Sequence, residues 1–266
     1  MNKTILITGA TSGFGKAIAT RFAQEGYTVC ITGRREKRLG EIKAELEKEY
    51  NIKVIALAFD VRDKKQVADA VSKLQEQVRK IDILVNNAGL ASGFSTIDEG
   101  NVDDWDLMID TNLKGLLYVT RQIAPMMRAH SSGHIINIGS TAGKMVYKNG
   151  NVYCATKFAV EALNQAMRID LLPYGIKVTA INPGMAETEF SLVRFKGDEV
   201  RAKKTYEGIK PLQARDIANI AWFCASLPPH VCINDLTVTC LTQATSVYGI
   251  KEAEKIPPSP EVEPRI

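Results

Sequence analysis

The chain of 266 residues lacks any apolar run that approaches the roughly 18–20 residues needed to cross a bilayer. Its first nine residues, Met1 to Gly9, hold one lysine and a three-residue apolar run, which is far short of a secretory signal peptide. It also lacks a strong charge of one sign, because 34 Lys and Arg face 30 Asp and Glu, a net charge of +4. That excess is too small to predict nucleic acid or an acidic membrane as a partner.

Cysteine is scarce and irregularly placed, which argues against a disulfide framework or a zinc site. The five cysteines are odd in number, widely spaced and without a Cys-x-x-Cys pair. We expect them to be reduced, in a cytoplasmic protein. His130 and His134 are four residues apart, but Ser131-Ser132-Gly133 between them indicates a turn. We predict that both are surface residues, and no metal is expected.

The overall composition is that of a soluble globular protein, with 45% apolar and 24% charged residues. A chain of this length buries enough apolar surface to fold without staples. Only the C-terminal end departs from this composition, because four of the ten prolines are Pro257, Pro258, Pro260 and Pro264. Proline continues neither a helix nor a central strand. The sequence therefore predicts a domain over residues 1–249 and an extended Pro-rich arm over residues 250–266.

Apolar runs alternate with amphipathic stretches along the whole predicted domain. Continuous Val, Ile and Leu runs predict buried strands at residues 4–8, 28–32, 53–59, 83–86, 134–138, 177–181 and 235–240. Helical spacing predicts helices at residues 16–24, 39–50, 102–128 and 152–172, and a capping box at Asp63 opens another. This alternation predicts right-handed βαβ units in a single doubly wound, Rossmann-type α/β domain with a parallel sheet of about seven strands.

A glycine-rich turn, Thr8-Gly9-Ala10-Thr11-Ser12-Gly13-Phe14-Gly15, follows the first predicted strand. Glycines here allow a tight turn and a close approach to a ligand, and the following helix offers free N–H groups to a phosphate. A dinucleotide site is therefore expected. The spacing Gly-x-x-x-Gly-x-Gly, preceded by Thr, resembles that of the short-chain dehydrogenase/reductase family.

The end of the second predicted strand selects between NAD and NADP. An NAD site offers an acidic residue to the ribose 2′-hydroxyl about twenty residues past the glycines. Here the strand ends in Arg34-Arg35, with no acidic residue before Glu36. Two adjacent guanidinium groups are suited to clamp a 2′-phosphate. We therefore predict NADP as the cofactor.

Tyr153-Cys-Ala-Thr-Lys157 matches the catalytic Tyr-x-x-x-Lys of that family, and helical spacing places both side chains on one face. We expect the ammonium to lower the pKa of the phenol towards neutrality, so that it exchanges a proton with an alcohol or carbonyl. A second match, Tyr206 to Lys210, makes the motif alone weak evidence. Ser140 lies thirteen residues before Tyr153, where the family places its carbonyl-binding serine, whereas Tyr206 is preceded at that distance by Val193.

The resemblance extends over about residues 3–245 and implies further roles. Asn112 corresponds to the fourth catalytic residue, which distorts its helix and holds a water that links Lys157 to solvent. A homotetramer is implied, with the helices near 102–128 and 152–172 between subunits. The residues implied to bind the cofactor are Gly9, Thr11, Ser12, Gly13, Phe14, Gly15, Arg34, Arg35, Asp60, Val61, Asn87, Ala88, Gly89, Tyr153, Lys157, Pro183, Gly184 and Thr188.

The segment from Glu187 to Asp198 is similar to that of the NADP-dependent 3-hydroxy acid (serine) dehydrogenase branch of the family. That resemblance implies interconversion of serine, allo-threonine or 3-hydroxypropionate with the 3-oxo acid or semialdehyde. A small carboxylate needs a cation beside Tyr153, and we expect Arg194, or else Lys196, to supply it. Ser140 and Tyr153 complete the expected substrate site. Two alternatives stay open: a reductase of a neutral or bulkier ketone, and an NADP sensor without turnover.

Overall fold

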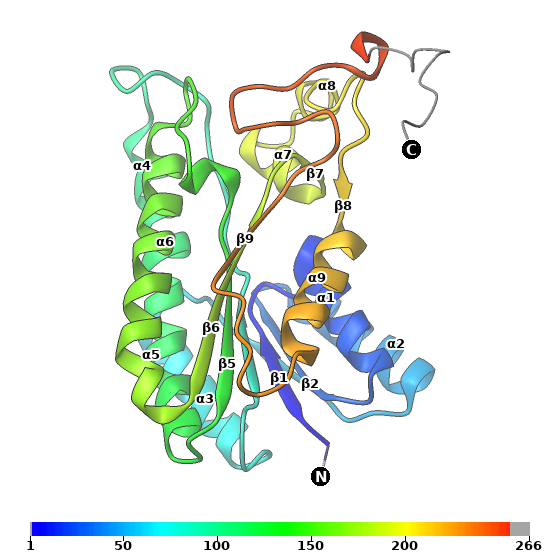
Figure 1. The fold of residues 1–266 in the computed structure, drawn as a ribbon, viewed down its shortest axis with the longest axis vertical. Helices are drawn as coiled ribbons and strands as arrows, with labels where there is room; N and C mark the ends of the chain where they lie inside the picture. The colour runs from blue at the N-terminus through cyan, green and yellow to red at the C-terminus, as the bar shows by residue number, and fades with distance from the viewer. Residues whose placement is uncertain (1, 256–266) are drawn as a thin grey trace, which may run out of the picture.

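A computed structural model describes residues 2–255 of the chain (Figure 1). The four clustered prolines of the predicted arm lie outside the described residues. The start of that arm packs on the domain, because Ile250 N–H donates to the Thr242 carbonyl oxygen at 2.8 Å and Glu252 N–H donates to Gly208 at 2.8 Å. The boundary at residue 249 stays a prediction.

The predicted sheet is confirmed as seven strands in the order β3-β2-β1-β4-β5-β6-β9, all parallel. Their bounds are β1 Thr4–Ile7, β2 Thr28–Gly33, β3 Val54–Ala58, β4 Ile83–Asn86, β5 Gly133–Ile138, β6 Ile176–Pro183 and β9 Asp235–Val238. Each corresponds to a predicted apolar run. The continuous apolar pattern arises because helices cover both faces of the sheet.

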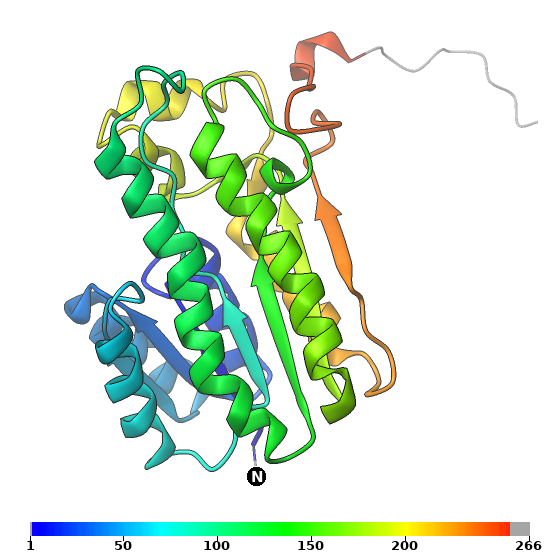
Figure 2. The same cartoon turned by 90° about the vertical axis from the view of Figure 1, so that its left-hand side faces the viewer.

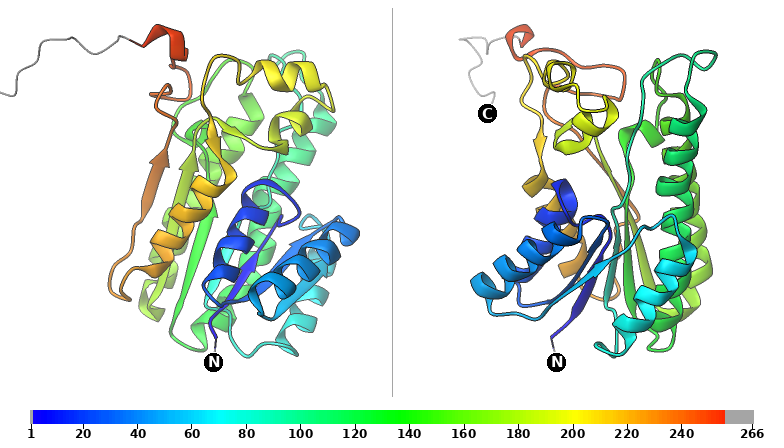
Figure 3. Two further views of the ribbon diagram at one scale, coloured as in Figure 1. Left: turned by 90° about the vertical axis from the view of Figure 1, so that its right-hand side faces the viewer. Right: turned by 180° about the vertical axis from the view of Figure 1, so that it is seen from behind.

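Two layers of helices enclose the sheet. One face carries α3 Lys64–Gln75, α4 Val102–Ile109, α5 Leu116–Arg128 and α6 Asn151–Leu171 (Figure 2). The other carries α1 Gly13–Gln24, α2 Glu36–Tyr50 and α9 Ala214–Ser226 (Figure 3). Separate apolar cores form on the two faces, one around Phe22, which is 0% exposed, and one around Leu74, also 0% exposed. The single sheet is therefore packed against an apolar core on each of its faces within one domain.

The reversal of strand order at β1 and β4 fixes the position of the binding crevice. From β1 the chain adds β2 and β3 on one side, and from β4 it adds β5, β6 and β9 on the other. Helices following β1 and β4 thus lie on opposite faces and leave a crevice at the carboxyl ends of the strands. The glycine-rich turn after β1 and Asn87 after β4 meet there, since Asn87 Nδ2 donates to the Thr8 carbonyl oxygen at 2.8 Å.

Several short elements were not predicted and lie over this crevice. They are the strand pair β7 Ala186–Glu187 and β8 Leu212–Gln213, and the helices α7 Glu189–Arg194 and α8 Glu199–Lys204. In Figure 1, α7 and α8 lie above the carboxyl ends of the strands. Helices of six residues are too short to show a helical period, so periodicity does not predict them. We refer to residues 186–206 as the lid.

The predicted surface position of His134 is wrong. His134 lies on β5, is 4% exposed, and its Nε2 lies 2.8 Å from Thr179 Oγ1 on the neighbouring strand. Burial lowers the pKa of this imidazole to about 3. The turn ends at Ser131 and β5 begins at Gly133, so His134 already belongs to the strand.

Over residues 2–255, no helix is both long and apolar enough to pass through a membrane. The same residues contain no group of three His, Cys, Asp or Glu side chains arranged to hold a metal ion.

Candidate active site

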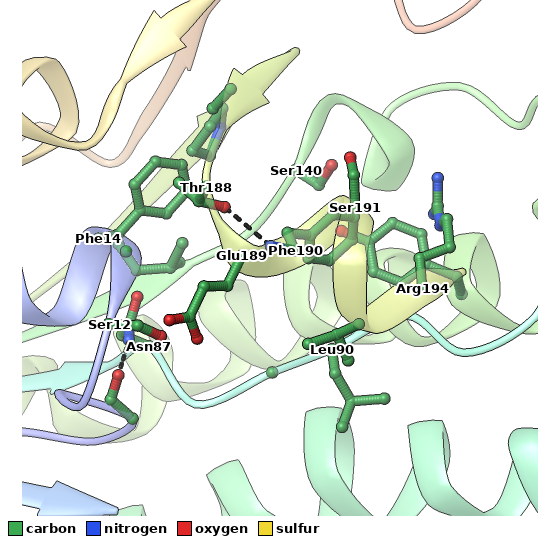
Figure 4. A pocket seen from close by; sticks show the side chains of 18 of the residues that line it. Ser12, Phe14, Asn87, Leu90, Ser140, Thr188, Glu189, Phe190, Ser191 and Arg194 are labelled. Carbon is green, nitrogen blue, oxygen red and sulfur yellow. Dashed lines mark hydrogen bonds between the residues drawn. The ribbon is translucent and has the colours of Figure 1, made fainter. Parts of the chain in front are cut away.

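A cavity of about 770 Å³ occupies the crevice and extends from the glycine-rich turn to the lid. Arg34 and Arg35 line one end, and Ser140, Tyr153 and Lys157 line the other. Figure 4 shows side chains from both ends, with α7 between them. Most of the predicted site residues line this cavity, which the topology therefore assembles from segments far apart in sequence. The exceptions are Gly15, Asn112 and Lys196, the alternative to Arg194.

The glycine-rich turn has a backbone that only glycine adopts with ease and leaves space close to the chain. Gly9 and Gly13 have φ values of +66° and +51°. A Cβ on Gly15 would lie 2.4 Å from the Gly9 carbonyl oxygen, so no side chain fits there. Within residues 2–255, the Ser12 side chain does not cap α1, and the first N–H groups of this 12-residue helix face the cavity end.

Two arginines after β2 mark the far end of the cavity. Arg34 and Arg35 both line it, with Asp60 and Val61 from the loop after β3 beside them. Arg35 donates from Nε to Thr11 Oγ1 at 2.9 Å and from Nη2 to Ser12 Oγ at 2.9 Å. The guanidinium is therefore held against the glycine-rich turn.

Ser140, Tyr153 and Lys157 converge at the other end. Ser140 follows β5, and its N–H donates to Asn182 Oδ1 on β6 at 3.1 Å. Tyr153 and Lys157 lie on consecutive turns of α6, with the ammonium 5.9 Å from the phenol ring centre. Lys157 Nζ donates to the Ile138 carbonyl oxygen at 2.9 Å. Both side chains are 8% exposed.

Burial controls the titration of this pair. It raises the pKa of Tyr153 above its usual value, an effect that Tyr147 reinforces and that Arg194 and Ser140 oppose. It also lowers the pKa of Lys157 to about 8, against an opposing influence of Glu161. The expected lowering of the phenol pKa by the ammonium is therefore not found in the chain alone. Desolvation, which disfavours the charged form of each group, is the largest influence on both pKa values.

Asn112 interrupts the long helix predicted over residues 102–128. Residues Asp110–Gly115 form a π-helical turn between α4 and α5. Asn112 Oδ1 accepts from Leu90 N–H at 2.8 Å, and its Nδ2 donates to Thr156 Oγ1 on α6 at 3.1 Å. The helix distortion implied by the resemblance is present, and the side chain lies between the β4 loop and the helix of Tyr153. π-Turns of this kind occur often at functional sites.

Arg194, at the end of α7, lies above Tyr153 in an aromatic enclosure. Its guanidinium carbon is 5.0 Å from the ring centre of Tyr153 and 5.1 Å from that of Phe190. Nη2 donates to the Tyr147 hydroxyl, and Nε is buried without a partner among the described residues. Lys196 points elsewhere, pairing with Asp104 at 2.9 Å. Of the two predicted cations, only Arg194 lines the main cavity.

Sequence reasoning missed several residues of the cavity wall. Phe190 packs on Tyr153 with ring centres 5.5 Å apart, and Gln243 Oε1 accepts from Met185 N–H at 2.7 Å. Tyr206 tethers the lid, since its hydroxyl donates to the Ala186 carbonyl oxygen at 2.8 Å. Two of them carried a signal, because Tyr206 begins the second Tyr-x-x-x-Lys match and Phe190 lies in the segment from Glu187 to Asp198. Gln243 lies on a C-terminal segment without a motif.

The cavity suits a dinucleotide whose adenosine end carries a phosphate. The glycine cradle, the open end of α1 and the two arginines lie at one end. Thr188 lies across from Gly13, with its Cβ 3.4 Å from the position a Gly13 side chain would take. Backbone clearance and positive charge together favour a pyrophosphate and a second phosphate.

Residues 3–198 match the family model described as short chain dehydrogenase. The chain is 47% identical over 241 residues to NADP-dependent 3-hydroxy acid dehydrogenase of Salmonella typhi, covering 90% of this chain and 96% of that protein. It is 43% identical to sulfoacetaldehyde reductase 2 of Chromohalobacter salexigens, with coverage of 94% and 99%. A closed serine dehydrogenase complexed with NADP+ superposes with a TM-score of 0.84 at 44% identity, covering 94% and 99%. These findings confirm the resemblance drawn from the motifs.

The glycine cradle can be tested by filling it. Gly15→Ala places a methyl group 2.4 Å from the Gly9 carbonyl oxygen, so the turn must shift, and we expect the Kd for NADP to rise by at least about tenfold. Gly40→Ala is the matched control, because its Cβ meets nothing within 4 Å on α2. Titration calorimetry measures both. Equal Kd values for the two variants would contradict the assignment of the cradle.

Proposed function

The chain belongs to the short-chain dehydrogenase family and is an NADP-dependent oxidoreductase, and on this basis we propose that its substrates are small 3-hydroxy acids. It would interconvert serine, allo-threonine or 3-hydroxypropionate with the corresponding 3-oxo acid or semialdehyde. The position of Arg194, 5.0 Å above the Tyr153 ring, carries this proposal. A cation beside the proton-transfer group favours a substrate whose carboxylate is close to its hydroxyl.

The proposed mechanism divides the roles among residues that the cavity brings together. NADP, when bound, supplies the hydride acceptor or donor. Ser140 donates a hydrogen bond to the substrate oxygen, and Tyr153 transfers the proton at that oxygen. Lys157 and Asn112 support proton exchange at Tyr153. Lys157 is held in place by donating from Nζ to the Ile138 carbonyl oxygen. The raised pKa of Tyr153 keeps the phenol protonated in the free chain, the form that donates to a carbonyl.

The proposed binding of NADP uses the residues predicted for it. Gly13, Phe14 and the N-terminus of α1 would hold the pyrophosphate, and Arg34 and Arg35 the 2′-phosphate. Thr188 and the Pro183-Gly184 turn border the opposite end, near Ser140. Asn87 would help to shape the groove, because its amide fixes the glycine-rich turn.

Tyr153→Phe tests the proton-transfer role. The variant removes only the hydroxyl, so we expect turnover to fall by at least about a thousandfold while the Kd for NADP changes little. The measurements are steady-state absorbance of NADPH and calorimetric titration of NADP. The matched control is Tyr206→Phe, which loses the second Tyr-x-x-x-Lys hydroxyl. Retained turnover in Tyr153→Phe would remove Tyr153 from this role.

Arg194→Ala tests the substrate class. Loss of a charge-assisted contact costs about 1.5–3 kcal/mol, so we expect kcat/KM for 3-hydroxy acids to fall by roughly 10- to 100-fold. Neutral alcohols should change much less. Lys196→Ala is the control, since Lys196 pairs with Asp104 outside the main cavity. Equal losses on acids and neutral alcohols would contradict carboxylate binding by Arg194.

The substrate panel should include a short sulfonate aldehyde and neutral ketones. The relationship to a sulfoacetaldehyde reductase supports a sulfonate as a second candidate, because a guanidinium fork can also donate to two of the three oxygens of this tetrahedral anion. A panel measured with NADP and with NAD separates these classes. Preference for a bulky neutral ketone would contradict both anionic substrates.

We also propose that the chain forms a homotetramer through α5 and α6. These helices lie side by side on the outer face (Figure 2) and expose Leu117, Phe158 and Ile169, and Leu172 directly after α6 is exposed as well. Ile169 is 73% exposed, an unusual position for a large apolar side chain. Light scattering should give about four times the chain mass of 29.3 kDa, and Ile169→Glu should lower that mass. A monomer mass for the unmodified chain would contradict the proposal.

A further inference from the structure

The lid helix α7 connects the two charged ends of the cavity. It has only six residues, with Glu189 as its first and Arg194 as its last. In Figure 4, Glu189 extends from α7 towards the glycine-rich turn, and Arg194 lies at the other end of the helix. Movement of one end of so short an element therefore affects the other.

Glu189 binds the arginines at the adenosine end of the cavity. Its Oε2 accepts from Arg35 Nη1 at 2.9 Å, and its Oε1 accepts from Arg38 Nη1 at 2.6 Å. The remaining donors of Arg35 are directed to Thr11 and Ser12. Glu189 thus takes the outward-facing donor of the guanidinium that we propose for the 2′-phosphate.

The carboxylate of Glu189 is charged at neutral pH, because its pKa is lowered. Burial acts to raise its pKa, but hydrogen bonds from Arg38 and Arg35 lower it to about 2. Protonation therefore does not release it. The ion pairs themselves contribute little to stability, because all three side chains are 38–46% exposed to solvent. A phosphate dianion is a stronger competitor for the same donors.

We propose that Glu189 competes with the 2′-phosphate of NADP for Arg35 and Arg38, and that this competition couples cofactor binding to the lid. Without a 2′-phosphate, Glu189 fixes the start of α7 to α2 and the glycine-rich turn. A bound 2′-phosphate displaces the carboxylate and frees this end of the helix that carries Arg194. NAD, with a neutral 2′-hydroxyl, leaves the contact in place. This inference rests on the proposed 2′-phosphate role of Arg34 and Arg35.

Glu189→Gln tests the competition through binding alone. The variant removes the competing charge, so the Kd for NADP should fall by about threefold to fivefold, while the Kd for NAD stays within about twofold. The matched control is Glu199→Gln on α8, whose side chain is 73% exposed and lies 4.0 Å from Lys203. Calorimetric titration measures the Kd for NADP and for NAD of the unmodified chain and of both variants. An unchanged or higher Kd for NADP in Glu189→Gln would overturn the proposal.

Hydrogen exchange tests the coupling to the lid. Adenosine 2′,5′-bisphosphate carries the 2′-phosphate but no nicotinamide, and it should speed amide exchange over residues 189–195. Adenosine 5′-monophosphate should leave this exchange unchanged, and Glu189→Gln should exchange fast without any ligand. Unchanged or slower exchange with the bisphosphate would overturn the release of α7.

The two proposals fail in different ways. If the bisphosphate binds the unmodified chain no more tightly than the monophosphate, the 2′-phosphate role of Arg34 and Arg35 fails, and the competition fails with it. If the bisphosphate binds more tightly but Glu189→Gln binds NADP as the unmodified chain does, the competition alone fails. Activity on 3-hydroxy acids does not enter either measurement.

Discussion

The reversal of strand order between β1 and β4 is the constraint on which the rest of the structure depends. It sends consecutive helices to opposite faces and leaves the carboxyl ends of two adjacent strands uncovered. The Asn87 amide, bonded to the carbonyls of Thr8 and Gly9, holds the two strand ends together at this point. The strand order therefore creates the groove for a long, anionic cofactor, and side chains such as Arg34 and Arg35 select among cofactors.

Burial at the inner end of the groove disfavours the charged forms of Tyr153 and Lys157 and so sets their pKa values. Tyr153 and Lys157 are each 8% exposed, and desolvation pushes both towards their neutral forms. The lysine donates to the Ile138 carbonyl oxygen, whereas Arg194 lies over the phenol ring from the lid. In the chain alone, Arg194 and Ser140 are the groups that favour ionisation of Tyr153. A substrate anion on Arg194 would offset part of that influence, so substrate charge and phenol acidity are linked through one guanidinium.

The parts predicted from sequence are those with local signals. All seven strands of the main sheet were recognisable as continuous apolar runs, and the glycine-rich turn, Arg34–Arg35, Ser140, Tyr153 and Lys157 follow strand ends or share a helix face. The lid was not predictable, because six-residue helices show no period and their partners are distant. Glu189 meets Arg35 from 154 positions away, and Arg194 meets Tyr147 from 47. His134 was misplaced because a position next to a turn suggests exposure, although it begins the predicted strand over residues 134–138, which is buried.

The lid differs physically from the groove it covers, and that difference suits it to respond to ligands. Core strands are held by buried apolar contacts, whereas α7 is held at its first residue by half-exposed ion pairs that contribute little net free energy. Elements that move on binding are drawn from such weakly held parts of a fold. The rest of α7 is held more firmly, because Phe190, the next residue, packs on Tyr153 and aromatic rings surround Arg194 at the last residue. A releasable contact at Glu189, at the opposite end from Arg194, therefore links the proposed 2′-phosphate site to the proposed site of the substrate carboxylate.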